Sequence, residues 1–157
     1  MAWGKLGSAD GDGSGGFSIT DLTEKKFIQT LVYFEPSAYS YASYRFNNDS
    51  GSNYTTRKSF NGATDITYTS LTQADVGTSS NSSPQFMIFY IINNSSNEKL
   101  GVGYTVNINS TGAGNAPNRV ERIFKWTNTS SQITEIEVFP NSGNYSTDSN
   151  ASILGTD

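Results

Sequence analysis

The stretch Pro84–Ser96, PQFMIFYIINNSS, is the most apolar run of a polar chain and places the strongest constraint on its fold. Aromatic and β-branched residues dominate it and Asn-Asn-Ser-Ser ends it, so a strand is favoured over a buried helix. At about nine residues, the run is too short for a helix that spans a membrane. Because strand side chains alternate between two faces, both faces of this strand are apolar. We expect it to be the central strand of a sheet.

The rest of the chain consists of short extended segments between polar turns. Lys26–Phe34, KFIQTLVYF, is a second segment with apolar residues on both faces. Asn61 and Gly62 form a two-residue turn signal, which predicts a hairpin of Tyr54–Phe60 and Asp65–Leu71. About ten short strands without a convincing helix predict an all-β, single-domain antiparallel β-sandwich that is jelly-roll-like.

Glu98–Ile108 has the cleanest alternation in the chain. Its apolar side carries Leu100, Val102, Tyr104, Val106 and Ile108. Its other side is thin and polar, with Lys99 and two glycines. One-sided burial produces such a pattern, so we expect the apolar side to face the core.

Residues 1–16 differ in composition from the rest of the chain. Glycines are frequent after Asp10, and Trp3 and Leu6 are the large apolar side chains of this segment. Glycine loosens a backbone, so we expect residues 1–16 to be a flexible Gly/Asp-rich N-terminal arm. Residues 17–157 are expected to form the β-sandwich domain.

Asp10, Asp12, Ser14 and Asp21 have the spacing of an EF-hand-like calcium loop. They place oxygen atoms at its first, third, fifth and twelfth positions, with Gly15 at the sixth. Carboxylates and carbonyl groups at this spacing wrap a hard cation. A solvated Gly/Asp-rich linker produces the same spacing, so both interpretations stay open. Ca²⁺ is the one cofactor that the sequence suggests.

The composition argues against several classes of function. The chain has no Cys and no His, so it lacks thiolate chemistry, the commonest general base and the commonest zinc ligand. Its net charge of −4 provides no basic surface for nucleic acid or for a membrane. We expect a non-enzymatic protein with no nucleic-acid partner and no membrane insertion.

Tyrosine and asparagine suggest a glycan site. Rings that stack on sugars, next to planar amides that bond to hydroxyl groups, are typical of carbohydrate-binding faces. Tyr39, Tyr41, Asn53 and Tyr54 are the residues expected to form one. Its ligand would be a glycan on a host surface. The alternative is that these tyrosines belong to the core or to a subunit contact.

Several apolar side chains lie where a monomeric sandwich would expose them. The central strand is apolar on both faces, and two isoleucines lie on otherwise polar strand faces. Exposed apolar groups are costly for a monomer and natural at a subunit contact. The expected interface of a homo-oligomer consists of Trp3, Phe27, Leu31, Met87, Phe89, Ile91, Ile123 and Ile133.

The order of motifs resembles a family of viral proteins. The segments MAWGKLG, LTEKKFIQTLVYF, FNNDSGSNY, FYIINNSSNEKLGV, TGAGNAPNRVE, KWTNTS and SILGTD resemble small structural proteins of the virions of marine head-tailed viruses. This resemblance covers nearly the whole chain and implies a β-sandwich module of a capsid decoration, a tail or a fibre. It implies homo-oligomers in contact with other virion proteins, and no catalytic residues.

Three functions are consistent with these observations. The first is a non-enzymatic structural or assembly protein of a virion, acting through homo-oligomeric contacts. The second is a carbohydrate-binding module, assisted by Ca²⁺, for attachment to glycans. The third is a subunit of an extracellular filament or surface layer, which dense Asn-X-Ser/Thr acceptors would suit. The expected location is the virion, with an extracellular surface as the alternative.

Overall fold

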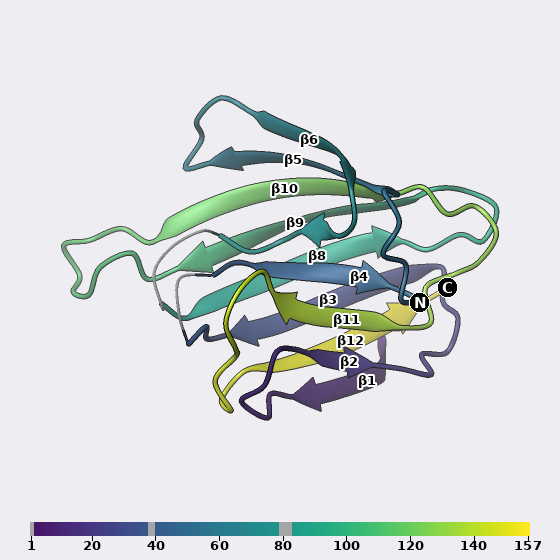
Figure 1. The fold of residues 1–157 in the computed structure, drawn as a ribbon, viewed down its shortest axis with the longest axis horizontal. Helices are drawn as coiled ribbons and strands as arrows, with labels where there is room; N and C mark the ends of the chain where they lie inside the picture. Colours follow the sequence, from purple (N-terminus) through teal and green to yellow (C-terminus); the bar gives the residue numbers. More distant parts are fainter. Residues whose placement is uncertain (1, 38–39, 79–82) are drawn as a thin grey trace.

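Two antiparallel sheets form a β-sandwich (Figure 1). The computed structural model describes residues 2–37, 40–78 and 83–157, and the expected all-β sandwich is confirmed. The larger sheet contains, in spatial order, β1 (Gly4–Asp10), β12 (Asn150–Thr156), β3 (Phe27–Phe34), β8 (Gln85–Ile92), β9 (Lys99–Asn107), β10 (Asn118–Trp126), β5 (Tyr54–Phe60) and β6 (Ile66–Leu71). The smaller sheet contains β2 (Phe17–Ile19), β11 (Ile136–Pro140), β4 (Ala42–Phe46) and β7 (Ala74–Asp75).

The apolar run that begins at Pro84 forms β8, which lies between β3 and β9 in the larger sheet. Its inner face consists of Met87, Phe89 and Ile91, all buried. Phe86 and Tyr90 on its other face are exposed. The expected central strand is therefore present, with one face in the core and one face uncovered. In the part of the chain that is described, no helix is long and apolar enough to cross a membrane.

The N-terminal segment differs from the expected flexible arm. Gly4–Asp10 is β1, which pairs with β12 at one edge of the larger sheet. Leu6 and Ala9 pack against the core, and the Gly11 N–H donates to the Ser149 carbonyl group at 2.6 Å. Backbone pairing and this packing hold residues 4–11 on the sandwich, so the domain begins well before residue 17.

An aromatic cluster fills the space between the sheets. The ring of Phe46 in the smaller sheet lies 5.7 Å from those of Phe124 and Trp126 in the larger sheet. Phe89 lies 5.6 Å from Phe124 and 5.8 Å from Tyr44. Aromatic pairs at these distances stabilise a core beyond their buried area, so this cluster joins the two layers.

The orientation of β9 is opposite to the one expected. Its glycine side faces the core, because aromatic rings of the neighbouring strands occupy the space above the glycines. A Cβ atom at Gly101 would lie 2.1 Å from the ring of Phe124, and one at Gly103 would lie 2.7 Å from the ring of Phe89. Aromatic side chains packed over glycine are a known device of β-sheets. The apolar side of β9, with Val102, therefore faces outward.

Lys99 also belongs to this inner side. Its ammonium group donates to the carbonyl oxygens of Asn97 and Asn128 at 2.9 and 2.8 Å. It lies 5.6 Å from the centre of the Trp126 ring. Burial lowers the pKa of Lys99. Alternation along the strand predicts that Lys99 faces solvent. The two carbonyl groups instead accept hydrogen bonds from its buried ammonium group, which offsets the cost of burying the charge.

Buried tyrosines predict a loss of stability in alkaline solution. Burial raises the pKa of Tyr44, Tyr54 and Tyr145 above its ordinary value near 10. In the unfolded chain these phenols lose their protons near pH 10, whereas in the folded chain they keep them. Stability should therefore be complete below that pH and fall above it, by about 1.4 kcal/mol per pH unit for each buried phenol. Urea titrations between pH 8 and 11 measure this slope; a Tyr44→Phe variant should show a shallower one, and a flat wild-type profile would contradict the prediction.

Candidate interaction surface

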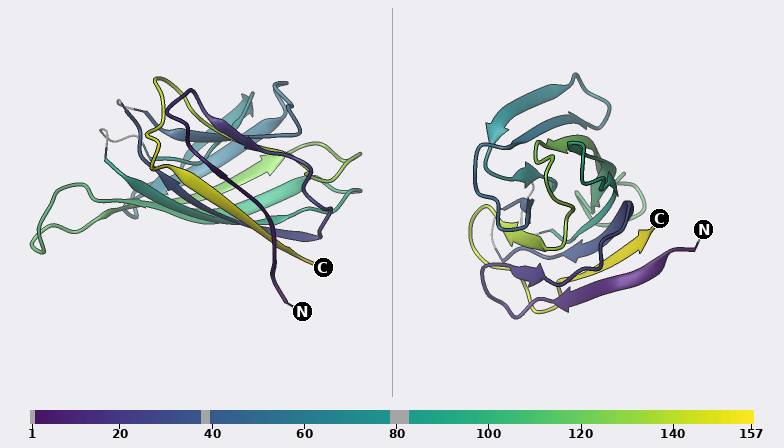
Figure 2. Two further views of the ribbon diagram at one scale, coloured as in Figure 1. Left: turned by 90° about the horizontal axis from the view of Figure 1, so that it is seen from below. Right: turned by 90° about the vertical axis from the view of Figure 1, so that its right-hand side faces the viewer.

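The outward side of the larger sheet is unusually apolar. We call it the outer face and define it by the exposed residues Phe86, Tyr90, Ile92, Leu100, Val102, Tyr104 and Ile123 on β8, β9 and β10. Val102 and Ile123 are 51% and 53% exposed. The smaller sheet covers only the opposite side of this sheet (Figure 2). Single exposed apolar residues are ordinary, but a contiguous patch marks an interaction site.

Strand register makes these side chains contiguous. Tyr90 is opposite Val102, which is opposite Ile123. In the neighbouring row, Ile92 is opposite Leu100. Directly opposed side chains on one face of a sheet lie within contact distance. The outer face is therefore one continuous apolar surface on β8 and β9, which reaches β10 at Ile123.

The N-terminal segment borders the outer face. The indole of Trp3 contacts the ring of Tyr90 edge-on, with the centroids 6.3 Å apart. Together with Phe27, Leu100 and Ile123, these two rings line an apolar groove of about 330 Å³. Nearly all of its lining is carbon, so a polar ligand such as a sugar would find few hydrogen-bond partners in it.

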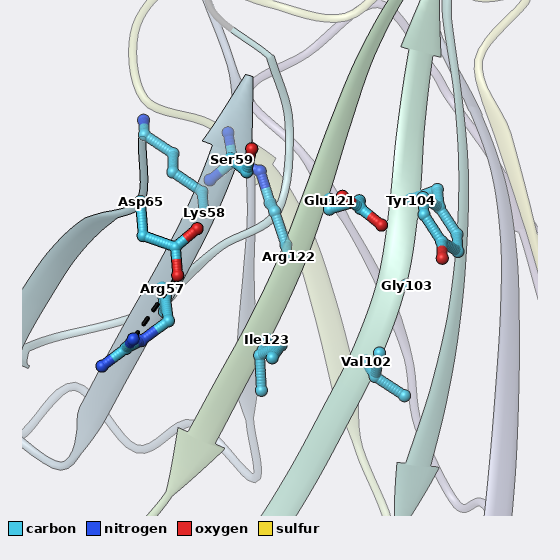
Figure 3. Close-up of a pocket in the computed structure, with 10 residues that line it drawn as sticks. All are labelled: Arg57, Lys58, Ser59, Asp65, Val102, Gly103, Tyr104, Glu121, Arg122 and Ile123. Atoms are coloured by element: carbon cyan, nitrogen blue, oxygen red, sulfur yellow. Dashed lines mark hydrogen bonds and ion pairs between the residues drawn. The ribbon is translucent and has the colours of Figure 1, made fainter. Parts of the chain in front are cut away.

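Ion pairs border the outer face on the side of β10 and β5. Figure 3 shows Tyr104, Glu121 and Ile123 on neighbouring strands, with Arg57 paired to Asp65 beyond them. The pairs are Arg57–Asp65 at 3.4 Å, Arg119–Glu121 at 3.8 Å and Lys125–Glu98 at 2.9 Å. Exposed pairs of this kind contribute little to stability. They give the apolar surface a polar rim of balanced charge on this side, and a polar rim beside an apolar centre is the arrangement of a protein interface.

Four of the predicted interface residues belong to the core instead. Met87, Phe89, Ile91 and Ile133 are at most 2% exposed. Met87, Phe89 and Ile91 lie on the inner face of β8, and the backbone N–H of Ile133 donates to the Asn93 side chain inside the molecule at 2.6 Å. These side chains are buried within one chain, so a neighbouring subunit cannot contact them. The outward residues of this two-faced strand are the even-numbered ones.

The other four predicted interface residues lie at the outward side of the larger sheet. Ile123 is central to it and Trp3 lies at its border. Phe27 and Leu31 are half-buried on β3, opposite Ile92 and Ile88. All four are therefore on or beside the exposed apolar surface, and their role in a subunit contact stays a prediction.

The predicted calcium ligands are not gathered into one site. The Asp12 carboxylate accepts a hydrogen bond from the Ser14 N–H at 2.8 Å, and bonds from Ser14 lower the pKa of Asp12. Asp10 ends β1, whereas Asp21 follows β2, between Ile19 and Leu22, whose side chains lie against Gly7. Gly7 and Asp10 are separated by about 10 Å of strand. Among the described residues, no three acidic side chains are grouped as for a metal ion.

The predicted glycan residues are also dispersed. Tyr54 is buried, with its ring 6.0 Å from that of Phe46 in the core. Tyr41 precedes β4, whereas Phe46 ends it, which is about 17 Å away along an extended strand. The Asn53 amide bonds to a carboxylate within its own turn at 3.0 Å, and Tyr39 lies outside the described residues. A core position for Tyr54 rules out the stacking role expected of it.

An ion-pair cluster between the sheets was missed by sequence reasoning. Arg122 on β10 is 2% exposed, and its guanidinium group contacts the Asp75 carboxylate at 2.8 Å. It also donates to the backbone carbonyl groups of Asp75 and Gly77. Lys58 lies 3.4 Å from the same carboxylate. A signal was present in the sequence: Arg122 occupies the same face of its strand as Val120, Phe124 and Trp126, and that apolar face is the buried one.

Comparison with known protein families, curated proteins and solved structures gave no match.

Proposed function

We propose that this chain is a non-enzymatic structural subunit of a virion, and that a second copy of the chain covers its outer face. The observation that carries the assembly is the continuous apolar surface of β8 and β9 together with Ile123 of β10. In a lone subunit Val102 and Ile123 leave apolar surface in water, and a contact between subunits would remove that surface from water and so be stabilised by it.

The area supports a second copy as the occupant. The outer face spans three strands, and with the flanking strands β12, β3 and β5 the outward side of the sheet reaches about 800 Å², for six strands about 4.8 Å apart and about 27 Å long. A stable protein interface buries about 800 Å² on each partner. The sheet is therefore large enough for a standard interface without a further element.

Charge supports the same occupant. The rim carries three cations and three anions: Arg57, Arg119, Lys125, Asp65, Glu98 and Glu121. Because the charges balance, two copies of the same face do not repel each other, and a two-fold axis can place unlike charges opposite each other. Two sheets that pack face to face in this way would lie about 10 Å apart.

The non-enzymatic part of the proposal rests on the side chains available. The carboxylates around the hollow in Figure 3, Asp65 and Glu121, are each paired with an arginine. The sequence supplies no imidazole or thiol to activate a nucleophile. The virion assignment rests on the sequence resemblance, and the genes beside the coding gene test it. Capsid, portal and tail genes would support it; genes for a surface layer would contradict it and favour the extracellular alternative.

A double variant, Val102→Lys with Ile123→Lys, tests the assembly. It places two ammonium groups at the centre of the outer face, where burial against a second copy would be prohibitive. Light scattering after size exclusion should show a wild-type oligomer and a variant monomer, with the dissociation constant raised on the order of 1,000-fold.

The matched control is Thr64→Lys with Thr111→Lys, which adds the same charge in exposed loops. It should assemble as the wild type does. A monomeric wild type would contradict the assembly, and so would a monomer that binds lipid vesicles. Equal masses for the wild type and both double variants would exclude the outer face as the contact.

A further inference from the structure

Strand β6 has a free edge and no covering layer. It is the last strand of the larger sheet, and β5 is the only described strand that pairs with it. Residues 66–70 are exposed without interruption, with Ile66 at 47% and Tyr68 at 39%. The β5–β6 hairpin projects beyond the smaller sheet (Figure 2). The unpaired N–H and C=O groups along such an edge are a template on which a strand of another chain can pair.

The two edges of the larger sheet differ. The other edge strand, β1, carries Lys5 and Asp10 and an irregularity between Lys5 and Gly7. Charges and bulges are the devices by which proteins block strand addition. The sequence of β6, ITYTSL, contains no charge and no proline. β6 has a register shift of its own, between Tyr68 and Leu71, where Ser70 has a φ of 55°; it lies near the end of the strand and leaves Ile66–Tyr68 in regular register.

We infer that β6 pairs antiparallel with β6 of a second copy around a two-fold axis at Thr67. In this register Ile66 is opposite the partner's Tyr68, and Tyr68 is opposite the partner's Ile66. Aromatic residues opposite β-branched ones are among the favourable cross-strand pairs. The chain is thus complementary to itself at this edge, and the uncharged strand brings no like charges together.

The space below the hairpin supports the pairing. Ile66 and Tyr68 point to the inner side, where they line a hollow of about 350 Å³ with Phe60 and Val120. Lys58 lies 5.0 Å from the centre of the Tyr68 ring. Ile66 and Tyr68 of a second copy would lie next to Ile66 and Tyr68 of the first, and together they would form a row of four side chains across the two strands. Backbone bonds of the added strand provide affinity, and the row fixes the register.

This contact is separate from the outer face and uses a different symmetry axis. Two different two-fold contacts on one chain link more than two copies, into a closed assembly with dihedral symmetry or into an open chain. The inference does not depend on the proposed function, because it rests on the edge of the sheet and not on its face.

A Thr67→Cys variant tests the inference directly, because the chain has no cysteine of its own. At the proposed axis the two Cα atoms would lie about 4.5–5.5 Å apart, within the range of a disulfide. Under mild oxidation we expect a covalent dimer on non-reducing gels. The control, Thr69→Cys, lies on the same exposed strand, but its two copies would be about 14 Å apart. It should form the dimer at least about tenfold more slowly.

Three results would overturn the inference: equal rates for the two variants, faster cross-linking at Thr69, or no disulfide at Thr67 while its thiol stays titratable. A folded-state check by circular dichroism accompanies each variant. The measurement is repeated with Val102→Lys and Ile123→Lys also present. Persistence of the Thr67 disulfide would support an independent edge contact, and its loss would contradict one, whatever the outer face does.

Discussion

A Gly103→Val variant should lose a large part of its stability. Gly103 lies on the inner side of β9, where an added Cβ atom would be 2.0 Å from the Ile88 carbonyl oxygen and 2.8 Å from the Phe89 Cα atom. Both belong to the backbone of the adjacent strand, which cannot move without breaking the centre of the sheet. Overpacking of this kind costs a large part of the total stability, here more than about 4 kcal/mol of the roughly 5–15 kcal/mol that domains have.

Urea unfolding followed by circular dichroism measures this effect. Gly114→Val is the matched control, because no atom lies within 4 Å of the Cβ position there; it should unfold like the wild type. If Gly103→Val were as stable as the control, the glycine side of β9 would face solvent. The outer face would then be the core, and the proposed assembly surface would not exist.

An Arg122→Met variant should lose about 3–5 kcal/mol of stability, since breaking a buried pair leaves an uncompensated charge. Asp75 would keep only Lys58, whose ammonium group is 3.4 Å away. The carbonyl group of Gly77 would lose its guanidinium donor as well. The pair joins β10 of one sheet to β7 of the other, so the loss should appear in global unfolding.

Equilibrium unfolding of two further variants checks the cause. Arg119→Met removes a 53%-exposed arginine side chain from the same strand and should change stability by less than about 0.5 kcal/mol. Adding Asp75→Asn to Arg122→Met should restore part of the loss, because the unpaired carboxylate is gone. An Arg122→Met variant that is as stable as Arg119→Met would show that the pair contributes nothing.

Sequence pattern predicted the strands better than it predicted their orientation. Alternation located β8, β9 and β10, and the Asn61-Gly62 turn located the hairpin of β5 and β6. Alternation cannot say which side of a strand faces inward when one side is apolar and the other carries glycine. In β9 the rings of Phe89 and Phe124 decide this, and they come from neighbouring strands.

The same limit applies to the candidate site. Ile123 and Ile133 both interrupt a polar strand face in the sequence, but only Ile123 is exposed, whereas Ile133 is buried in the core. Alternation alone assigns Tyr104 and Val102 to the core, because their contribution to the outer face depends on the register of β9 with β8 and β10. The edge of β6 depends on strand order, which places β6 last in its sheet. The spacing of residues along the chain predicts neither the register between strands nor the order of strands in a sheet.

Hydroxyl-radical footprinting at increasing protein concentration tests the assembly most directly. Tyr90 and Tyr104 are 48% and 44% exposed on the outer face, whereas Phe139 lies on the smaller sheet. As the chain assembles, the two tyrosines should lose most of their labelling and Phe139 should keep its own. Unchanged labelling of Tyr90 and Tyr104 in a sample that has assembled, or in one that stays monomeric throughout, would contradict a second copy on the outer face.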